Sequence, residues 1–247
     1  MRLMTKPVEY ADGDTTCVGF LAWNEEVADP RPCVLVNHAW GGLDKFAEDK
    51  AVEMAAMGYV GFALDNYGGG QTPEDVEGKQ ALMTPLVEDR AALLARLTAG
   101  YEAAAALDEV DADAMSAMGF CFGGLCTLDM ARAGMALDAA ISFHGLLGGH
   151  DLPEEKTSAS VLIAHGWNDP MAKPADVEAV MDELNRAGAD VQLLAFSNTK
   201  HAFMVPSADA DEMGLMYNAK SAKRAWGQCL ELLDEHFRFH GTDAEVA

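Results

Sequence analysis

Residues 114–134 read AMSAMGFCFGGLCTLDMARAG, and they predict a strand, a sharp turn and a helix within one short unit. The centre of the unit is G-x-C-x-G-G, which places Cys121 between Gly119 and the pair Gly123 and Gly124. Glycine at these positions lets a strand and a helix pass closely on either side of a strained turn. The apolar run at 114–118 predicts the strand, and the apolar residues at 125–131 predict the helix. Cys121 then lies at a helix N-terminus, where the partial positive charge favours a thiolate.

This spacing is typical of the nucleophile elbow of α/β-hydrolases, with cysteine in place of the usual serine. On the motif alone there is an alternative, in which Cys121 is a small buried apolar residue beside a glycine turn. The remainder of the chain has to decide between the two interpretations.

The length, net charge and cysteine count of the chain exclude several classes of protein. At 247 residues the chain is expected to form one domain, and its first six residues carry two charges and no apolar segment, so we expect a cytoplasmic protein. A formal net charge of -23 repels phosphate and anionic lipid, which excludes nucleic acid and membrane surfaces as partners. The five cysteines are scattered without a C-x-x-C pair, so neither a disulfide framework nor a zinc site is indicated.

Apolar runs and turn signals predict an α/β fold with a mostly parallel central sheet and helices on both faces. Buried strands are expected at 33–36, 60–64, 137–143, 161–164 and 191–196, helices at 45–57, 86–107, 174–187 and 216–238, and an edge hairpin at 5–22. Residues 71–86 contain two prolines and a glycine and are expected to form a mobile flap near the site. His150, in a glycine-containing loop, is expected to be exposed to solvent.

Two residues after late strands complete a candidate triad. Asp169 follows the strand at 161–164, and His201 follows the strand at 191–196. Loops at the carboxyl ends of parallel strands build the sites of open α/β sheets, and the chain order nucleophile, acid, histidine is that of α/β-hydrolases. The alternative for Asp169 is an Asx turn with Pro170.

The strand at 33–36 ends in Asn-His-Ala-Trp-Gly-Gly, at the position where an α/β-hydrolase places an oxyanion-hole amide. We assign the two donor amides to Ala39 and Phe122, although an ordinary glycine-rich turn also fits the first. The residues expected in the substrate pocket are His38, Trp40, Tyr67 and Phe203. The glycines after Tyr67 lack both nucleotide-binding patterns, so a phosphate loop is not indicated.

Taken together, these motifs make the chain resemble the dienelactone hydrolase family of cysteine-dependent α/β-hydrolases. The residues that carry the resemblance are Gly-Phe-Cys-Phe-Gly-Gly at 119–124, His-Gly-Trp-Asn-Asp-Pro at 165–170, His-Ala-Phe at 201–203, Tyr-Asn-Ala at 217–219 and Arg-Ala-Trp at 224–226. The resemblance implies a triad of Cys121, His201 and Asp169 that hydrolyses a lactone or ester without a metal or organic cofactor. A small-molecule substrate, and a monomer or small homo-oligomer, are expected.

Two departures from the family pattern bear on the substrate. Members active on dienelactone carry a glutamate where this chain has His38, and they use arginines to bind the substrate carboxylate, one of them just after the triad histidine. Here residues 202–205 read Ala-Phe-Met-Val. A neutral ester or lactone is therefore favoured, unless Lys79 or Arg90 takes the place of the arginine.

Three alternatives stay open at this level. The chain could be a true dienelactone hydrolase (carboxymethylenebutenolidase), a hydrolase of thioesters or small amides, or a non-catalytic scaffold of the same fold that binds a small ligand. Loss of the glutamate and the arginine favours the scaffold, and the presence of Cys121, Asp169 and His201 in the expected order opposes it.

Overall fold

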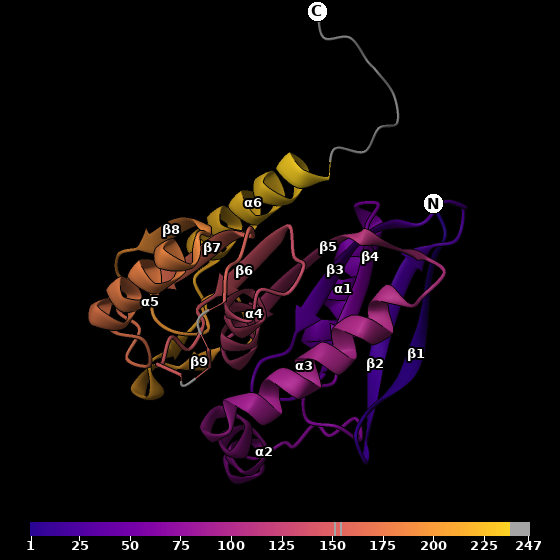
Figure 1. Cartoon of the computed structure of the whole chain (residues 1–247). Coiled ribbons are helices and arrows are strands. Elements are labelled where there is room, and N and C mark those ends of the chain that lie inside the picture. The colour runs from indigo at the N-terminus through magenta and orange to yellow at the C-terminus, as the bar shows by residue number, and fades with distance from the viewer. Residues whose placement is uncertain (151, 154, 238–247) are drawn as a thin grey trace, which may run out of the picture.

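The computed structural model describes residues 1–150, 152–153 and 155–237. Its centre is an eight-stranded sheet with the strand order β1-β2-β4-β3-β5-β6-β7-β8 (Figure 1). The strands are β1 (Leu3–Asp12), β2 (Thr15–Asn24), β3 (Arg31–Asn37), β4 (Val60–Leu64), β5 (Val110–Phe120), β6 (Ala139–Phe143), β7 (Ser160–Gly166) and β8 (Asp190–Phe196). The first two form the expected hairpin, which joins β4 in antiparallel pairing.

Strands β3 to β8 are parallel to one another, which confirms the predicted sheet. All residues of β4 and β6 are buried, as the continuous apolar sequences VGFAL and AAISF require of strands covered on both faces. Because the strands are parallel, their carboxyl ends meet at one edge of the sheet.

The described residues form six helices around the sheet, and five of them bury two separate apolar cores. They are α1 (Lys45–Ala56), α2 (Val76–Glu88), α3 (Arg90–Ala105), α4 (Phe122–Arg132), α5 (Pro174–Ala187) and α6 (Ala219–His236). Residues of α3, α4 and α5 belong to one core, and residues of α1 and α6 belong to the other. Figure 1 shows α3 and α4 in front of the sheet and α1 behind it, so helices lie on both faces.

The irregular structure predicted for residues 71–86 is wrong, because most of the segment is helix α2, and the predicted mobility stays a prediction. Asp75 caps the helix by accepting a hydrogen bond from the backbone N–H of Gly78, and Pro85 lies close to the end of the helix. The predicted helix at 86–107 also divides at Asp89, whose side chain accepts from the N–H of Ala92 and begins α3. Helix α2 and strand β9 (Asp209–Ala210) lie at the same lower end of the molecule in Figure 1.

The last helix begins at Ala219, three residues later than predicted. Residue 216 instead belongs to β10 (Leu215–Met216), which pairs with β9 in a short hairpin. The predicted end at residue 238 lies outside the described residues. In the part of the chain that the structure describes, no helix has both the length and the apolar character of a membrane span.

Candidate active site

Cys121 lies at the tight turn between β5 and α4. Its backbone has φ 56° and ψ -115°, a left-handed conformation that is costly for a residue with a side chain. A Cβ atom added to Gly119 would lie 1.9 Å from the carbonyl oxygen of Gly123. A Cβ atom added to Gly123 would lie 2.1 Å from the carbonyl oxygen of Asn37. Both glycines are therefore required for the turn, and the turn directs Cys121 to the carboxyl edge of the sheet.

His201 and Asp169 are joined by a short hydrogen bond in the interior. Nδ1 of His201 lies 2.7 Å from Oδ2 of Asp169, and both side chains are buried. The carboxylate can only accept, so Nδ1 carries the proton and Nε2 stays available. The remaining hydrogen-bond contact of the His201 ring is with the side chain of Cys121. The other oxygen of Asp169 accepts from the backbone N–H of Met171, which fixes the carboxylate.

The electrostatic surroundings of His201 favour its charged form. Burial lowers the pKa of His201, but the charge of Cys121 and the hydrogen bond to Asp169 outweigh it and raise the pKa to about 10. The raised pKa makes His201 an imidazolium at neutral pH. The structure thus brings the three predicted triad residues together.

The backbone amides of Ala39 and Phe122 are the two predicted donors beside Cys121. Phe122 is the first residue of α4, so its N–H is one of the helix donors without an intrahelical acceptor. Neither amide has a backbone hydrogen-bond acceptor among the residues that the structure describes. Two free amides at this position are what an oxyanion hole requires.

A cavity of about 510 Å³ opens over this site. We call it the Cys121 cavity, and Ala39, Cys121 and His201 are among the residues that line it. One wall comes from α2, through Lys79, Gln80 and Met83, and another from residues 205–215. Lys79 lies with Nζ 5.5 Å from the centroid of the Trp40 ring, and Asp44 and Asp209 are the acidic residues of the lining.

Of the four residues predicted to line the pocket, Trp40 does so and His38, Tyr67 and Phe203 do not. Nε2 of His38 accepts from the N–H of Asn66 at 3.2 Å, and Nδ1 lies 2.6 Å from the carbonyl oxygen of Ala39. These bonds turn the ring into the protein, where burial lowers its pKa. His38 therefore shapes the turn and is uncharged.

The other two residues are held behind the cavity wall in a similar way. The hydroxyl of Tyr67 donates to the carbonyl oxygen of Trp40 at 2.9 Å, and its ring packs edge-on against His38. Phe203 is fully buried against Phe196. Their positions after strands were predicted correctly, but the direction of each side chain is set by partners that the sequence does not show.

The sequence interpretation assigned no role to His144, which the structure places in the Cys121 cavity. The residue follows β6 directly, and its ring centroid lies 5.1 Å from that of His201. The signal was available, because a histidine after a parallel strand lies at the same edge as the other site residues. Burial and the neighbouring charge of His201 lower the pKa of His144 well below its usual value.

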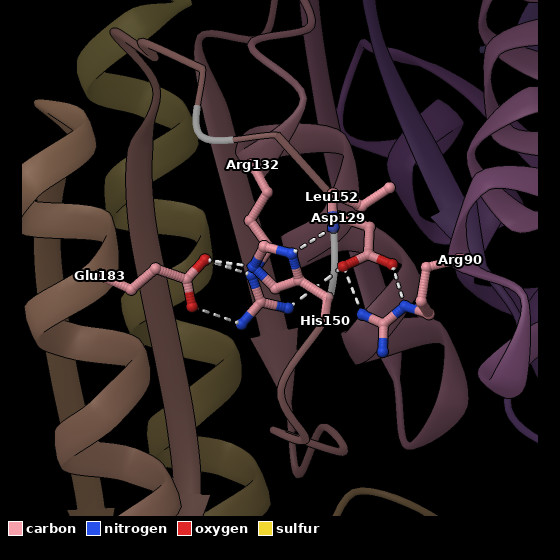
Figure 2. A network of polar contacts seen from close by, with 6 residues as sticks. All are labelled: Arg90, Asp129, Arg132, His150, Leu152 and Glu183. Carbon is pink, nitrogen blue, oxygen red and sulfur yellow. Dashed lines mark hydrogen bonds and ion pairs between the residues drawn. The ribbon is translucent and has the colours of Figure 1, made fainter.

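Arg90 and His150 belong to a buried ion network and do not reach the cavity (Figure 2). Nε of Arg90 donates to Asp129 at 2.6 Å, and Asp129 also accepts from Arg132 at 3.1 Å. Arg132 in turn binds Glu183, and Nε2 of His150 lies 2.7 Å from the same carboxylate. The predicted exposure of His150 is thus wrong, and Arg90 cannot bind a substrate anion.

Comparisons with known proteins bear on the whole chain. Residues 18–237 match the model of the dienelactone hydrolase family. The solved structure of m3DLH is 37% identical, with a TM-score of 0.90 over 95% of this chain and 99% of that chain. A dienelactone hydrolase-like promiscuous phosphotriesterase from metagenomic libraries is 34% identical, with a TM-score of 0.91 over 96% and 100% of the two chains. An uncharacterized protein of Caenorhabditis elegans is 35% identical over 58% of this chain and 92% of its own length.

Proposed function

The chain belongs to the dienelactone hydrolase family, and from this premise we propose that it hydrolyses a carboxylic ester or lactone with Cys121 as the nucleophile. The observation that carries the proposal is the 2.7 Å bond between His201 and Asp169, in a cavity that Cys121 also lines. This is the relation of nucleophile, base and orienting acid that covalent acyl transfer needs.

In the first half of the proposed reaction, the sulfur of Cys121 attacks the ester carbonyl. The amides of Ala39 and Phe122 donate to the oxyanion, and one such donor typically contributes about 3 to 4 kcal/mol to the transition state. The carbon–oxygen bond then breaks, and His201 gives its Nε2 proton to the leaving alkoxide. The product is an alcohol and a thioester on Cys121.

In the second half, water hydrolyses the thioester. His201, now neutral, takes a proton from water through Nε2 while the oxygen attacks the carbonyl. The carbon–sulfur bond breaks, and the acid leaves. Asp169 holds the ring in one orientation and tautomer during both halves, through its bond to Nδ1.

We further propose that neutral substrates are preferred. The Cys121 cavity is lined by one lysine, Lys79, and by two aspartates, Asp44 and Asp209. Lys79 is held over Trp40 as a single cation, without the bidentate geometry that an arginine offers to a carboxylate. These charges give an anionic lactone no net attraction.

The decisive experiment measures hydrolysis of p-nitrophenyl acetate by the wild type and by Cys121→Ala. We expect the substitution to lower kcat/KM by about 10³-fold or more, because it removes the nucleophile. Cys126→Ala is the matched control, since Cys126 lies on the same helix, is fully buried and is absent from the cavity lining. If the wild type is folded and as inert as Cys121→Ala, the non-catalytic scaffold is the better interpretation.

A panel of substrates tests the preference for neutral substrates. It compares neutral p-nitrophenyl esters, p-nitrophenyl thioacetate, p-nitroacetanilide and a dienelactone carboxylate, with the wild type and with Lys79→Gln. We expect the neutral esters to give the highest kcat/KM, and Lys79→Gln to change their values little. A dienelactone that is hydrolysed fastest, and that loses its advantage in Lys79→Gln, would instead identify a true carboxymethylenebutenolidase.

A neutral phosphotriester belongs in the same panel as a second candidate substrate. The relative that is 34% identical is described as a promiscuous phosphotriesterase, and a triester has no charge to conflict with Asp44 and Asp209. We expect this activity to be lower than that on esters and to disappear in Cys121→Ala, because the same thiol would attack phosphorus.

A further inference from the structure

We propose that His144 positions the hydrolytic water in the second half of the reaction, by accepting a hydrogen bond from the O–H of water whose proton is not transferred to His201. The inference rests on the proposed function, because it concerns the thioester on Cys121. It assigns to His144 a positioning role in deacylation, separate from the roles of the three triad residues.

The backbone holds His144 firmly beside the elbow. Its N–H donates to the carbonyl oxygen of Ala164 at 2.8 Å, and the N–H of Leu146 donates to the carbonyl oxygen of Cys121 at 3.2 Å. Between them, Gly145 passes so close that an added Cβ would lie 2.2 Å from Oγ of Ser142. His144 is therefore fixed relative to the nucleophile by the segment that follows it.

The conformation and surroundings of His144 are unusual for a residue that only fills space. Its φ is 39°, a left-handed value that costs free energy for a side chain other than glycine. The side chain is fully buried, yet neither ring nitrogen has a hydrogen-bond partner among the described residues. Buried polar atoms in proteins are nearly always paired, so these two nitrogens lack a partner that a bound water can supply.

The ring packs edge-on against the triad histidine, with 5.1 Å between centroids and 66° between planes. On another side the His144 ring packs edge-on against Phe203, with 5.3 Å between the ring centroids. Nε2 of His201 has no partner other than Cys121 within the described part of the chain. The two histidines thus line the same cavity as Cys121, where water must approach the thioester.

The charge states of His144 and His201 fit these two roles. Burial and the neighbouring His201 keep the pKa of His144 low, so His144 is neutral and offers one acceptor nitrogen and one donor. The attacking water gives one proton to Nε2 of His201, and a hydrogen bond from its other hydrogen to His144 orients the oxygen. His144 exchanges no proton, and the second hydrogen stays on the product acid.

The test separates acylation from deacylation in stopped-flow hydrolysis of p-nitrophenyl acetate. We expect His144→Phe to release the first equivalent of p-nitrophenol within about twofold of the wild-type rate, and to deacylate about 10- to 100-fold more slowly. Intact-protein mass spectrometry should then find acetylated enzyme in the steady state. Added hydroxylamine, a strong nucleophile, should restore turnover.

Two further variants guard against a purely structural explanation. His144→Asn keeps a hydrogen-bond acceptor and tolerates a positive φ, so it should recover part of the deacylation rate. His165→Phe removes an imidazole that is also buried and unpartnered among the described residues, but that does not line the cavity. It should keep the wild-type ratio of deacylation to acylation.

The outcomes distinguish this inference from the proposed function. Wild-type deacylation in a folded His144→Phe or His144→Asn overturns the role of His144 and leaves the cysteine esterase intact. An equal loss in both steps assigns His144 to general site structure and also overturns it. If the wild type forms no acyl-enzyme on Cys121, both proposals fail together.

Discussion

At the scale of single residues, Gly119 shows how strictly the elbow constrains its sequence. Any side chain at this position would meet the backbone of Gly123 at 1.9 Å, and backbone cannot rotate away. The close approach of the Gly123 backbone allows only glycine at position 119. The glycine spacing could therefore be recognised in the sequence. The conformation of Cys121 between the glycines follows from the same geometry.

We expect Gly119→Ala to destabilise the protein by about 3 kcal/mol or more, which is the upper range for overpacking. Gly227→Ala is the control, since Gly227 lies on the exposed side of α6 with nothing within 4 Å of an added Cβ. That change should stabilise the protein by about 0.5 to 1 kcal/mol through helix propensity. Urea unfolding measures both, and shifts of the same sign would contradict the explanation.

His201 gives a prediction about pH. Its pKa is raised to about 10 in the folded protein and is about 6.5 in an unfolded chain. The stability from its charged form is therefore complete below about pH 6.5 and is lost as pH rises through about 10. We expect the free energy of unfolding to fall between pH 7 and pH 10, and to fall less in Cys121→Ala, which lacks the charge that raises this pKa.

Urea unfolding at four pH values in this window provides the measurement. Other groups, such as lysines and tyrosines, titrate alike in the two proteins, so the difference between their slopes reports the pair of Cys121 and His201. Parallel slopes would mean that the two side chains are not coupled in the folded state.

The three triad residues were predictable because each follows a strand that the apolar pattern marks clearly. The orientation of side chains was not predictable in the same way. His38, Tyr67 and His144 all follow parallel strands, yet the first two turn into the protein and only the third lines the cavity. What separates them is a few hydrogen bonds, to Asn66 and Trp40, that link segments distant in sequence.

At the scale of elements, the strands and most helices could be predicted, and α2 could not. The strand β4 was predicted with its observed bounds, since five buried residues between turn signals leave little freedom. In α2 the glycine lies in the first turn, but Pro85 lies inside the helix and gives up one backbone hydrogen bond, so the residue pattern does not indicate a helix here. The hairpin of β9 and β10 is too short to produce a periodic pattern.

The buried ion network joins three helices, since Arg90 begins α3, Asp129 and Arg132 lie on α4, and Glu183 lies on α5 (Figure 2). Asp129 is fully buried between two arginines. We expect Asp129→Ala to lower stability by about 3 to 5 kcal/mol, because it leaves a buried arginine without its carboxylate.

The exposed ion pair of Lys200 and Asp211, at 2.6 Å, is the matched control. Asp211→Ala should cost less than about 1 kcal/mol, because water and salt screen that pair. Denaturant unfolding gives the free energy of unfolding of the two variants. A small decrease in Asp129→Ala would show that the network contributes little to stability.

At the scale of the whole molecule, charge dominates the response to solution conditions. The chain carries 40 acidic and 17 basic residues, so its surface repels itself. We expect the Tm to rise as NaCl is increased from about 0.02 to about 1 M, as screening shortens the Debye length from about 20 Å to about 3 Å. Calorimetry at neutral pH tests this, and a Tm that stays level or falls would contradict it.

Helix α2 has no buried residue, yet it supplies Lys79, Gln80 and Met83 to the cavity wall. Cys121, Asp169 and His201, to which we assign the catalytic roles, come from other segments of the chain. Side chains of α2 can therefore be exchanged at little cost to folding. A directed-evolution library confined to these three positions would change which substrates the cavity accepts and leave Cys121, Asp169 and His201 unchanged.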